Sequence, residues 1–319
     1  MLEVGLQVDE WLQTIPVPQE IVRKHRKRGD YIKLTSLFYV TSPKEKLLTL
    51  TQFAYWIFFW DDDIDTGGEL CDDIEAALAC CASTRACIDA CLGPSPSFDP
   101  PPSIRSSVTI LYSILRDLRA GLGPATREHL RVELCDYVDS VIHQHKARHS
   151  EGLLCPWVHL EMRAVDVGVF PFITVNEFGR GFELPPQVRH HEAMKAMIVQ
   201  SSKLVVLQNE VLSLQKEFKV GQVENMCLMF VSKYNMTVQE SVAKVLDLIR
   251  EHYEDMKAIE ARLPWSETDE ELNKALHEYV LTARRLMTGT THWSYVCERY
   301  VKFRQMGDDF ELVMHLTRG

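Results

Sequence analysis

An acidic run closes a long apolar segment near the start of the chain. Residues 61–65 read Asp-Asp-Asp-Ile-Asp and follow the aromatic stretch 47–60. That stretch contains no proline or glycine, so the sequence predicts a helix, on which Asp61 and Asp65 lie one above the other with Asp62 beside them. Carboxylates packed this closely repel one another unless a cation neutralises them. Hard divalent cations such as Mg²⁺ prefer such oxygen ligands and often share them with a phosphate.

A second set of polar side chains recurs every four residues further along the chain, at Asn209, Ser213 and Glu217. On a helix with 3.6 residues per turn, four residues advance about 400°, so the three side chains form one slowly drifting ridge. An amide oxygen, a hydroxyl and a carboxylate can together hold a hard cation, and the Lys216 ammonium could then reach an anion bound to that cation. Such residues are also common on solvated helix faces, but the apolar run 204–207 before them favours a partly buried ridge.

Length and composition limit the kinds of protein this chain can be. Its 319 residues suffice for one large domain or two ordinary ones, and its 46% hydrophobic and 25% charged residues are ordinary for a globular protein. The net charge of −10 argues against a nucleic-acid or anionic-membrane partner, because both attract basic surfaces. An acidic protein that acts on an anionic substrate needs metal ions to bridge the two.

The cysteines and the N-terminus indicate where the protein works. The nine cysteines are odd in number and form no CxxC pair of the zinc-binding type. The N-terminus begins Met-Leu-Glu-Val, which does not resemble a signal peptide, and no uninterrupted apolar run reaches membrane-spanning length. We therefore expect a cytoplasmic protein without a transmembrane segment, in a reducing setting where most cysteines are small core residues.

Helical periodicity dominates the chain and predicts an all-α fold. Glycine is sparse, and the alternation typical of strands is hard to find. The proline-rich segment 93–103 is expected to be a loop between two helices of one domain, which spans residues 1–319. The predicted helices cover residues 17–27, 43–65, 72–91, 104–120, 126–147, 153–170, 190–217, 225–234, 238–261, 268–287 and 291–303.

The two polar motifs together resemble the motif pair of class I terpene synthases of the microbial type. In that family an aspartate-rich motif and an Asn/Ser/Glu triad hold three magnesium ions on facing helices, and the ions bind the diphosphate of a prenyl substrate. The residues that match the two motifs are Asp61, Asp62 and Asp65, and Asn209, Ser213 and Glu217.

Two further segments extend the resemblance across most of the chain. The family has a diphosphate-sensing arginine about 46 residues before the Asn of its triad, where this chain has Arg163. Asp166 fits the acid that follows this arginine, and Val167, at the family's effector position, is bulkier than the glycine of many members.

The last matching segment lies near the C-terminus. The family ends with an Arg-Tyr pair on its last helix, preceded by Trp-Ser, and here Trp293-Ser294 precedes Arg299-Tyr300. One small departure from the family pattern is Glu210, where an Asp that is not a ligand often follows the Asn of the triad.

The resemblance implies an activity and a set of roles. The fold would be an α-helical bundle with a central cavity, often dimeric in the family, in which three Mg²⁺ ions, or Mn²⁺ in their place, assist the ionisation of a linear prenyl diphosphate. Farnesyl diphosphate is the expected substrate and a sesquiterpene the expected product. The diphosphate would be bound by Arg163, Lys216, Arg299 and Tyr300. Phe58 and Trp293 would line the cavity; Phe53 is a weaker candidate, since an aromatic residue there more often belongs to the core.

Several alternatives remain open. A diterpene cyclase would accept geranylgeranyl diphosphate through the same motifs, because no motif encodes substrate length. An isoprenyl diphosphate synthase shares the fold and the first motif, but it carries a second aspartate-rich motif where this chain has Asn, Ser and Glu.

A calcium-binding helix–loop–helix module is the alternative from a different class. Asp61, Asp63, Asp65 and Asp72 occupy positions one, three, five and twelve of such a loop. However, Thr66 stands where the loop requires glycine, and position twelve lacks the bidentate glutamate.

Overall fold

The computed structural model describes residues 2–64, 68–148, 154–300 and 313–317, and every regular element within these ranges is a helix. The predicted all-α fold is therefore confirmed. None of the described helices is long and apolar enough to cross a membrane. In chain order the helices are α1 (Leu2–Thr14), α2 (Gln19–Gly29), α3 (Tyr31–Phe38), α4 (Lys44–Ile64), α5 (Ile74–Leu92), α6 (Ser106–Gly121), α7 (Pro124–Arg148), α8 (Pro156–Asp166), α9 (Val169–Arg180), α10 (Pro186–Arg189), α11 (Glu192–Leu212), α12 (Leu214–Val220), α13 (Met226–Tyr234), α14 (Val238–Glu260) and α15 (Glu270–Val296).

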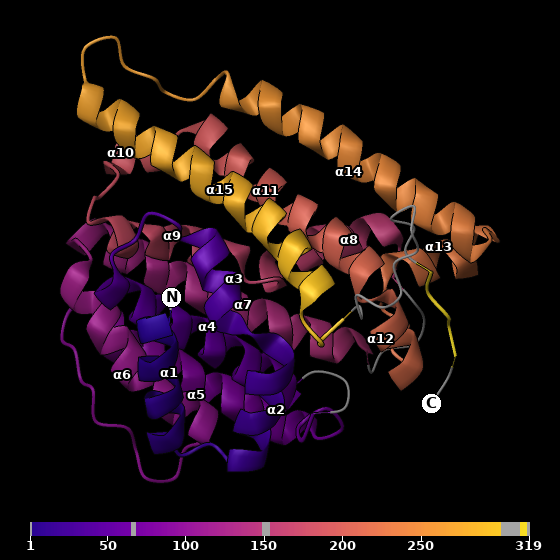
Figure 1. The fold of residues 1–319 in the computed structure, drawn as a ribbon, viewed down its shortest axis with the longest axis horizontal. Coiled ribbons are helices and arrows are strands. Elements are labelled where there is room, and N and C mark those ends of the chain that lie inside the picture. Colours follow the sequence, from indigo (N-terminus) through magenta and orange to yellow (C-terminus); the bar gives the residue numbers. More distant parts are fainter. Residues whose placement is uncertain (1, 65–67, 149–153, 301–312, 318–319) are drawn as a thin grey trace.

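Helix α4, which carries the acidic run, is enclosed by other helices (Figure 1). It packs against α1, α3, α6 and α9. A helix enclosed in this way has almost no solvent face, which explains why residues 47–60 are mostly apolar. Phe53, Trp56 and Trp60 are all fully buried there.

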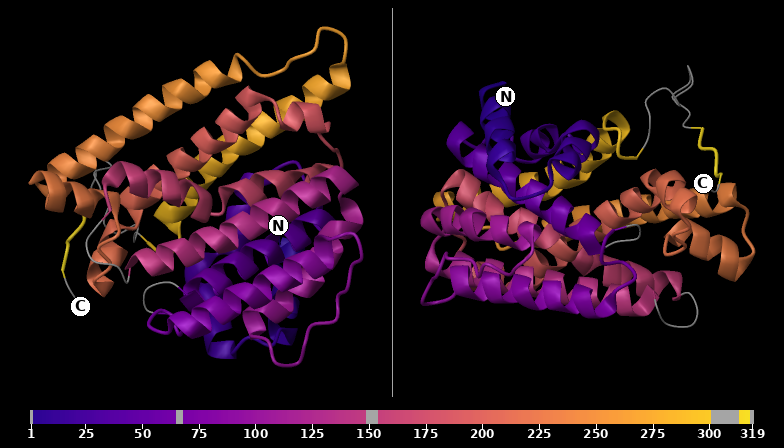
Figure 2. Two further views of the ribbon diagram at one scale, coloured as in Figure 1. Left: turned by 180° about the vertical axis from the view of Figure 1, so that it is seen from behind. Right: turned by 90° about the horizontal axis from the view of Figure 1, so that it is seen from below.

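Helix α11, which carries the start of the second motif, has a similar central place in the C-terminal half. It packs against α8, α9, α14 and α15. Figure 2 shows α14 and α15 along one side of the molecule and α5, α6 and α7 along the other. Helix α9 contacts both α4 and α11, so it joins the two halves into one bundle.

Two predicted helices are each divided in the structure. The predicted helix 153–170 covers α8 and only the first residues of α9, which continues to Arg180; the two are separated at Gly168, whose left-handed φ of 76° ends the first helix. Residues 190–217 are interrupted at Ser213, a break that the sequence did not predict. Its hydroxyl donates to the carbonyl oxygen of Asn209 over 2.6 Å, and this type of side-chain hydrogen bond bends helices.

Other helix boundaries also differ from the predictions. Helices α1, α3 and α10 and most of α9 were not predicted, and the predicted gap at residues 288–290 is wrong because α15 runs straight through it. Gly289 there allows close packing instead of a break: a Cβ atom at this position would come within 3.0 Å of Phe38. Helix α15 ends at Val296. Arg299 and Tyr300 therefore lie in a turn after the helix, whereas the prediction placed them on the last helix. The proline-rich segment joins α5 to α6 as expected.

Candidate active site

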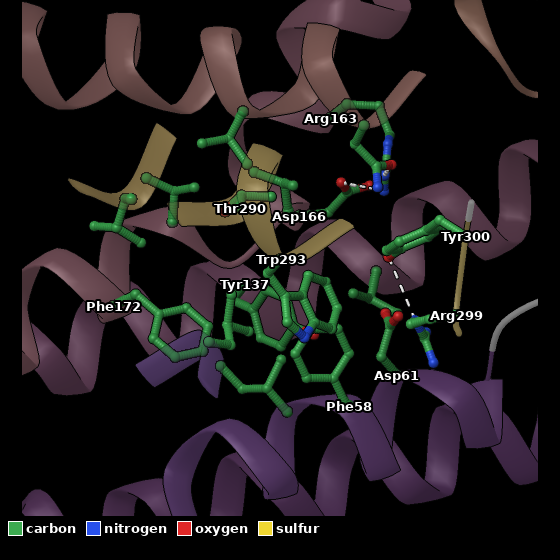
Figure 3. A pocket seen from close by; sticks show the side chains of 18 of the residues that line it. Phe58, Asp61, Tyr137, Arg163, Asp166, Phe172, Thr290, Trp293, Arg299 and Tyr300 are labelled. Atoms are coloured by element: carbon green, nitrogen blue, oxygen red, sulfur yellow. Dashed lines mark hydrogen bonds and ion pairs between the residues drawn. The ribbon is translucent and has the colours of Figure 1, made fainter. Parts of the chain in front are cut away.

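A cavity of about 120 Å³ lies between α4, α8, α11 and α15, with further walls from α3, α7, α9, α12 and the turn after α15. Figure 3 shows aromatic side chains at one end of it and charged side chains at the other. The lining residues are Leu34, Phe38, Ile57, Phe58, Asp61, Ile64, Tyr137, Val141, Gln144, Arg163, Asp166, Val167, Val169, Phe172, Val205, Asn209, Lys216, Glu217, Gln222, Leu286, Thr290, Trp293, Arg299 and Tyr300.

The aromatic end of the cavity is held rigidly. Phe58 stacks face to face on Tyr31 with ring centroids 4.3 Å apart, and it lies 5.6 Å from the Trp293 ring. The indole nitrogen of Trp293 donates to the carbonyl oxygen of Gly29, so its orientation is fixed by the end of α2. Phe58 and Trp293 therefore both face the cavity, whereas the weaker candidate Phe53 packs against Trp56 and does not line it.

Consecutive aspartates at the end of α4 point in different directions, because neighbouring positions on a helix are separated by about 100°. Asp61 faces the cavity. Asp63 points away from it and accepts a hydrogen bond from the Ser107 hydroxyl over 2.7 Å. Burial raises the pKa of Asp63, although Ser107 and Arg105 oppose that shift. Asp65 lies outside the described residues.

Asp62 holds Arg299 beside the cavity. Nη1 and Nη2 of Arg299 donate to its two carboxylate oxygens over 3.0 and 2.6 Å, in the two-pronged geometry that suits a guanidinium. Nε2 of His25 lies 3.3 Å from the same carboxylate. Burial alone would raise the pKa of Asp62, but Arg299 and His25 hold it well below its usual range. Burial lowers the pKa of His25 to about 4, against the opposing effect of Asp62, so its imidazole is neutral near pH 7.

The second motif faces the cavity from the opposite side. Asn209 and Glu217 both line it, with Lys216 beside them, while Ser213 lies between the two and is fully buried. The four-residue spacing therefore keeps Asn209 and Glu217 on one face despite the interruption at Ser213. Burial and the nearby Glu210 raise the pKa of the Glu217 carboxyl, although Lys216 and Asn225 oppose that shift.

Arg163 reaches the cavity from α8 and is held by acidic and amide partners. Nη1 donates to Asp166 over 2.8 Å, and Nη2 donates to the side-chain oxygen of Asn209 over 3.4 Å. Burial alone would lower the pKa of this guanidinium, but Asp166 and Glu210 raise it, so the group stays charged. Asp166 and Val167 line the cavity next to it.

The turn after α15 brings a cationic group and a phenolic group to the charged end of the cavity. Nε of Arg299 donates to the Tyr300 hydroxyl over 3.3 Å, and its guanidinium carbon lies 5.0 Å from the centre of the Phe58 ring. The ammonium of Lys216 lies 5.7 Å from the centre of the Tyr300 ring. Arg299, Tyr300 and Lys216, which can all bind an anion, are thus gathered where the acidic end of α4 and the second motif face one another.

Several residues that support this site were not found from the sequence. Glu210 is fully buried and accepts hydrogen bonds from His159 over 3.1 Å and from the backbone amide of Met226. Asn225 donates to Glu217, and His25 contacts Asp62. The apolar surroundings of Glu210 in the sequence were the one available signal, because a charged residue seldom lies in such a run without a buried partner.

The donors that face the cavity suit a hard metal ion. Among the described residues, no three His, Cys, Asp or Glu side chains gather into a metal-binding cluster. The oxygen donors are instead divided between two walls, with Asp61 on one and Asn209 and Glu217 on the other. Because all three are carboxylate or amide oxygens, the set fits Mg²⁺ or Mn²⁺ better than zinc or copper.

Comparisons with known proteins agree with this geometry. The profile of terpene synthase family 2, C-terminal metal binding, matches residues 52–255. Terpene cyclase braA of Annulohypoxylon truncatum is 51% identical over 316 residues, which cover 99% of this chain and 84% of that protein. Silphinene synthase peniA of Penicillium patulum is 22% identical, with 93% of this chain and 79% of that protein covered.

Solved structures share the fold. Linalool/nerolidol synthase from Streptomyces clavuligerus, in complex with 2-fluorogeranyl diphosphate, superposes with a TM-score of 0.77 at 21% identity, over 92% of this chain and 98% of that one. An α-eudesmol synthase gives a TM-score of 0.80 at 18% identity, over 92% and 93% of the two chains.

An all-α bundle around a cavity with an aromatic end and a charged end is the architecture of a class I terpenoid synthase. The family match and the relative with half of its residues identical make the assignment specific. This chain belongs to the terpene synthase family of the microbial type, and it is a terpene cyclase, an enzyme of the lyase class, with a metal-binding region.

Proposed function

We propose that the enzyme ionises farnesyl diphosphate with the help of Mg²⁺ and cyclises the carbocation to a sesquiterpene. The carbon–oxygen bond breaks, diphosphate leaves with the electron pair, a new carbon–carbon bond closes a ring, and loss of a proton yields the product. The observation that supports this reaction is the division of one cavity into a charged end and an aromatic end (Figure 3). A single α-domain of this length favours the fifteen-carbon substrate.

The metal ions would be held at the charged end, between the two walls. The Ser213 hydroxyl donates its hydrogen to a carbonyl oxygen, which leaves its lone pairs for a cation. When bound, the ions would neutralise the charge that develops on the departing diphosphate. Three Mg²⁺ ions, or Mn²⁺ in their place, would be bound by Asp61, Asp62, Asp65, Asn209, Ser213 and Glu217.

Cationic side chains would bind the diphosphate directly. Arg163 and Arg299 stay protonated, because neighbouring acids raise the pKa of each guanidinium against the effect of burial. A guanidinium meets phosphate oxygens two at a time, which fixes the orientation of the leaving group. Lys216 and Tyr300 would complete this set of donors from the cavity wall.

The aromatic end would stabilise the carbocation and exclude water from it. Each aromatic face can stabilise a cation by about 0.5–2 kcal/mol without reacting with it. Phe58 and Trp293 are the predicted residues for this task, and Tyr137 and Phe172 line the same cavity. Because Phe58 is stacked on the buried Tyr31, its ring presents one fixed face to the substrate.

Incubation of the purified protein with Mg²⁺ and the ten-, fifteen- and twenty-carbon prenyl diphosphates tests the proposal. Gas chromatography of the extract should reveal a cyclic sesquiterpene from the fifteen-carbon substrate, and an assay of the aqueous phase should detect one diphosphate released for each product. A cyclic product from the twenty-carbon substrate alone would make the enzyme a diterpene cyclase. A longer linear diphosphate formed after addition of isopentenyl diphosphate would contradict cyclisation.

A further inference from the structure

Asn225 connects three helices directly behind the second motif. Its side chain is fully buried at the N-terminus of α13, where Oδ1 accepts a hydrogen bond from the backbone amide of Cys227 over 2.9 Å. Nδ2 donates to the carbonyl oxygen of Glu210 over 2.7 Å and to Oε2 of Glu217 over 2.9 Å. One amide group therefore links the last turn of α11, the first turn of α12 and the start of α13.

The interruption at Ser213 lies between the two residues to which Asn225 donates. Asn209 lies on α11 and Glu217 on α12, so one straight helix does not fix their relative position. Gly221, with a left-handed φ of 81°, ends α12 and reverses the chain toward α13. That reversal brings Asn225 back behind the ridge, where it can contact both sides of the interruption.

Glu210, whose carbonyl oxygen accepts a hydrogen bond from Asn225, is itself anchored to α8. The carboxylate of Glu210 accepts hydrogen bonds from His159 over 3.1 Å and from the backbone amide of Met226, and its Oε1 lies 3.8 Å from Nε of Arg163. Both His159 and Arg163 belong to α8. The carbonyl oxygen that Asn225 binds therefore belongs to a residue whose own position is fixed by two neighbouring helices.

We propose that Asn225 is a positioning residue for the metal site: its side chain holds the Glu217 carboxylate in register with Asn209 before any ion binds. The inference rests on the proposed function, because it takes Glu217 as a metal ligand. Only an amide can accept from the backbone of α13 and donate twice from one short side chain. A carboxylate has the same shape but cannot donate, and a hydroxyl is too short to make all three contacts.

The substitution Asn225→Ser tests the role. Serine can still cap α13, but it removes both donations from Nδ2. Binding of inorganic diphosphate in the presence of Mg²⁺, measured by isothermal titration calorimetry without substrate, should weaken about 10- to 100-fold, as is typical when a residue that orients a metal ligand is removed. Asn225→Thr is a second variant, so the result does not depend on how well one variant folds.

Two controls separate positioning from a general loss of structure. Thr237→Ala removes the cap of α14, a helix that contributes no side chain to the cavity, and should leave diphosphate binding unchanged. In a Glu217→Ala background, Asn225→Ser should weaken binding no further, because the ligand that it positions is already absent.

Three results would overturn the inference. Wild-type affinity in both Asn225 variants would mean that Glu217 needs no such support. Equal weakening with and without the Glu217 side chain would show that Asn225 acts only on the fold. A wild-type protein that binds neither Mg²⁺ nor diphosphate would overturn the proposed function itself, and the inference with it.

Discussion

The two polar regions that face each other across the cavity are built in opposite ways. At the end of α4, three consecutive aspartates diverge, so that Asp61 faces the cavity, Asp62 binds Arg299 and Asp63 binds Ser107. In the second motif, Asn209 and Glu217 stand eight residues apart and face the same space. Helical spacing, more than the density of acidic residues, therefore decides which side chains reach the cavity.

The two regions also differ in what holds them. The acidic end of α4 is held by groups that can titrate or carry charge, since the Arg299 guanidinium and the His25 imidazole both contact Asp62. The second motif is held mainly by the neutral amide of Asn225 and by the buried Glu210 behind it. We therefore expect changes in pH to affect the acidic end of α4 first, and changes in side-chain shape to affect the second motif first.

Removal of the carboxylate from the second motif should have the largest effect. Glu217→Ala should lower kcat/KM by about a thousandfold or more, because charge stabilisation of the leaving group is lost. Asp63→Asn is the matched control from the other region, and it should keep kcat/KM within about tenfold, since Asp63 points away from the cavity. Steady-state kinetics at saturating Mg²⁺ measure both. Near-normal turnover of the Glu217 variant would remove the second motif from the chemistry.

The free energy of unfolding should depend on pH through His25. Its pKa is about 4 in the folded protein, against about 6.5 in an unfolded chain. As pH falls from about 6.5 toward 4, the unfolded chain takes up a proton that folded His25 does not, so stability decreases by up to roughly 3 kcal/mol. Urea denaturation in the absence of metal should show this loss for wild type and a smaller one for His25→Gln. Identical pH profiles would mean that His25 titrates normally.

Loss of the partner of Arg299 should have a moderate effect on stability. Asp62→Asn leaves a buried guanidinium without its counter-charge and should lower the free energy of unfolding by about 2 kcal/mol at pH 7. The expected loss in the free energy of unfolding is smaller than for a fully buried ion pair, because the Asp62 side chain is 21% exposed. Chemical denaturation gives the value directly. An unchanged midpoint would show that the ion pair contributes nothing.

A change in the aromatic wall should have the smallest effect on rate and a visible effect on the product. Phe58→Leu keeps apolar volume but removes a face that stabilises cations, and turnover should fall by no more than about tenfold. The ratio of products in gas chromatography should change, while the Mg²⁺ concentration for half-maximal activity should not. Lower activity with an unaltered product ratio would argue against contact between Phe58 and the carbocation.

The sequence predicted what depends on local spacing and failed where distant segments meet. The acidic run and the second motif were identified from residue type and interval, and Arg163 was identified from the resemblance to the family. The break at Ser213 was missed, because a serine that bonds its own helix looks like any other helical residue. His25 and Tyr31 were missed because their roles arise only when α2 and α3 pack against the end of α4.

Helix boundaries near the C-terminal end were also mispredicted where distant segments meet. The sequence predicted a gap at residues 288–290, yet α15 continues through it, and Gly289 lets the helix pack closely against Phe38. Arg299 lines the cavity, but it lies in a turn after α15 and not on the predicted last helix. Tertiary packing decided both cases, and no local pattern encodes it.

The central claim is that Asp61 on one wall and Asn209 and Glu217 on the other together hold metal ions and a diphosphate. A crystal structure of the protein with Mn²⁺ and diphosphate tests it most directly, because anomalous scattering locates Mn²⁺ without ambiguity. We predict Mn²⁺ peaks within about 2.0–2.3 Å of oxygen atoms on both walls, with the diphosphate between them and in contact with Arg163. Metal bound on one wall alone, or diphosphate bound outside this cavity, would contradict the account.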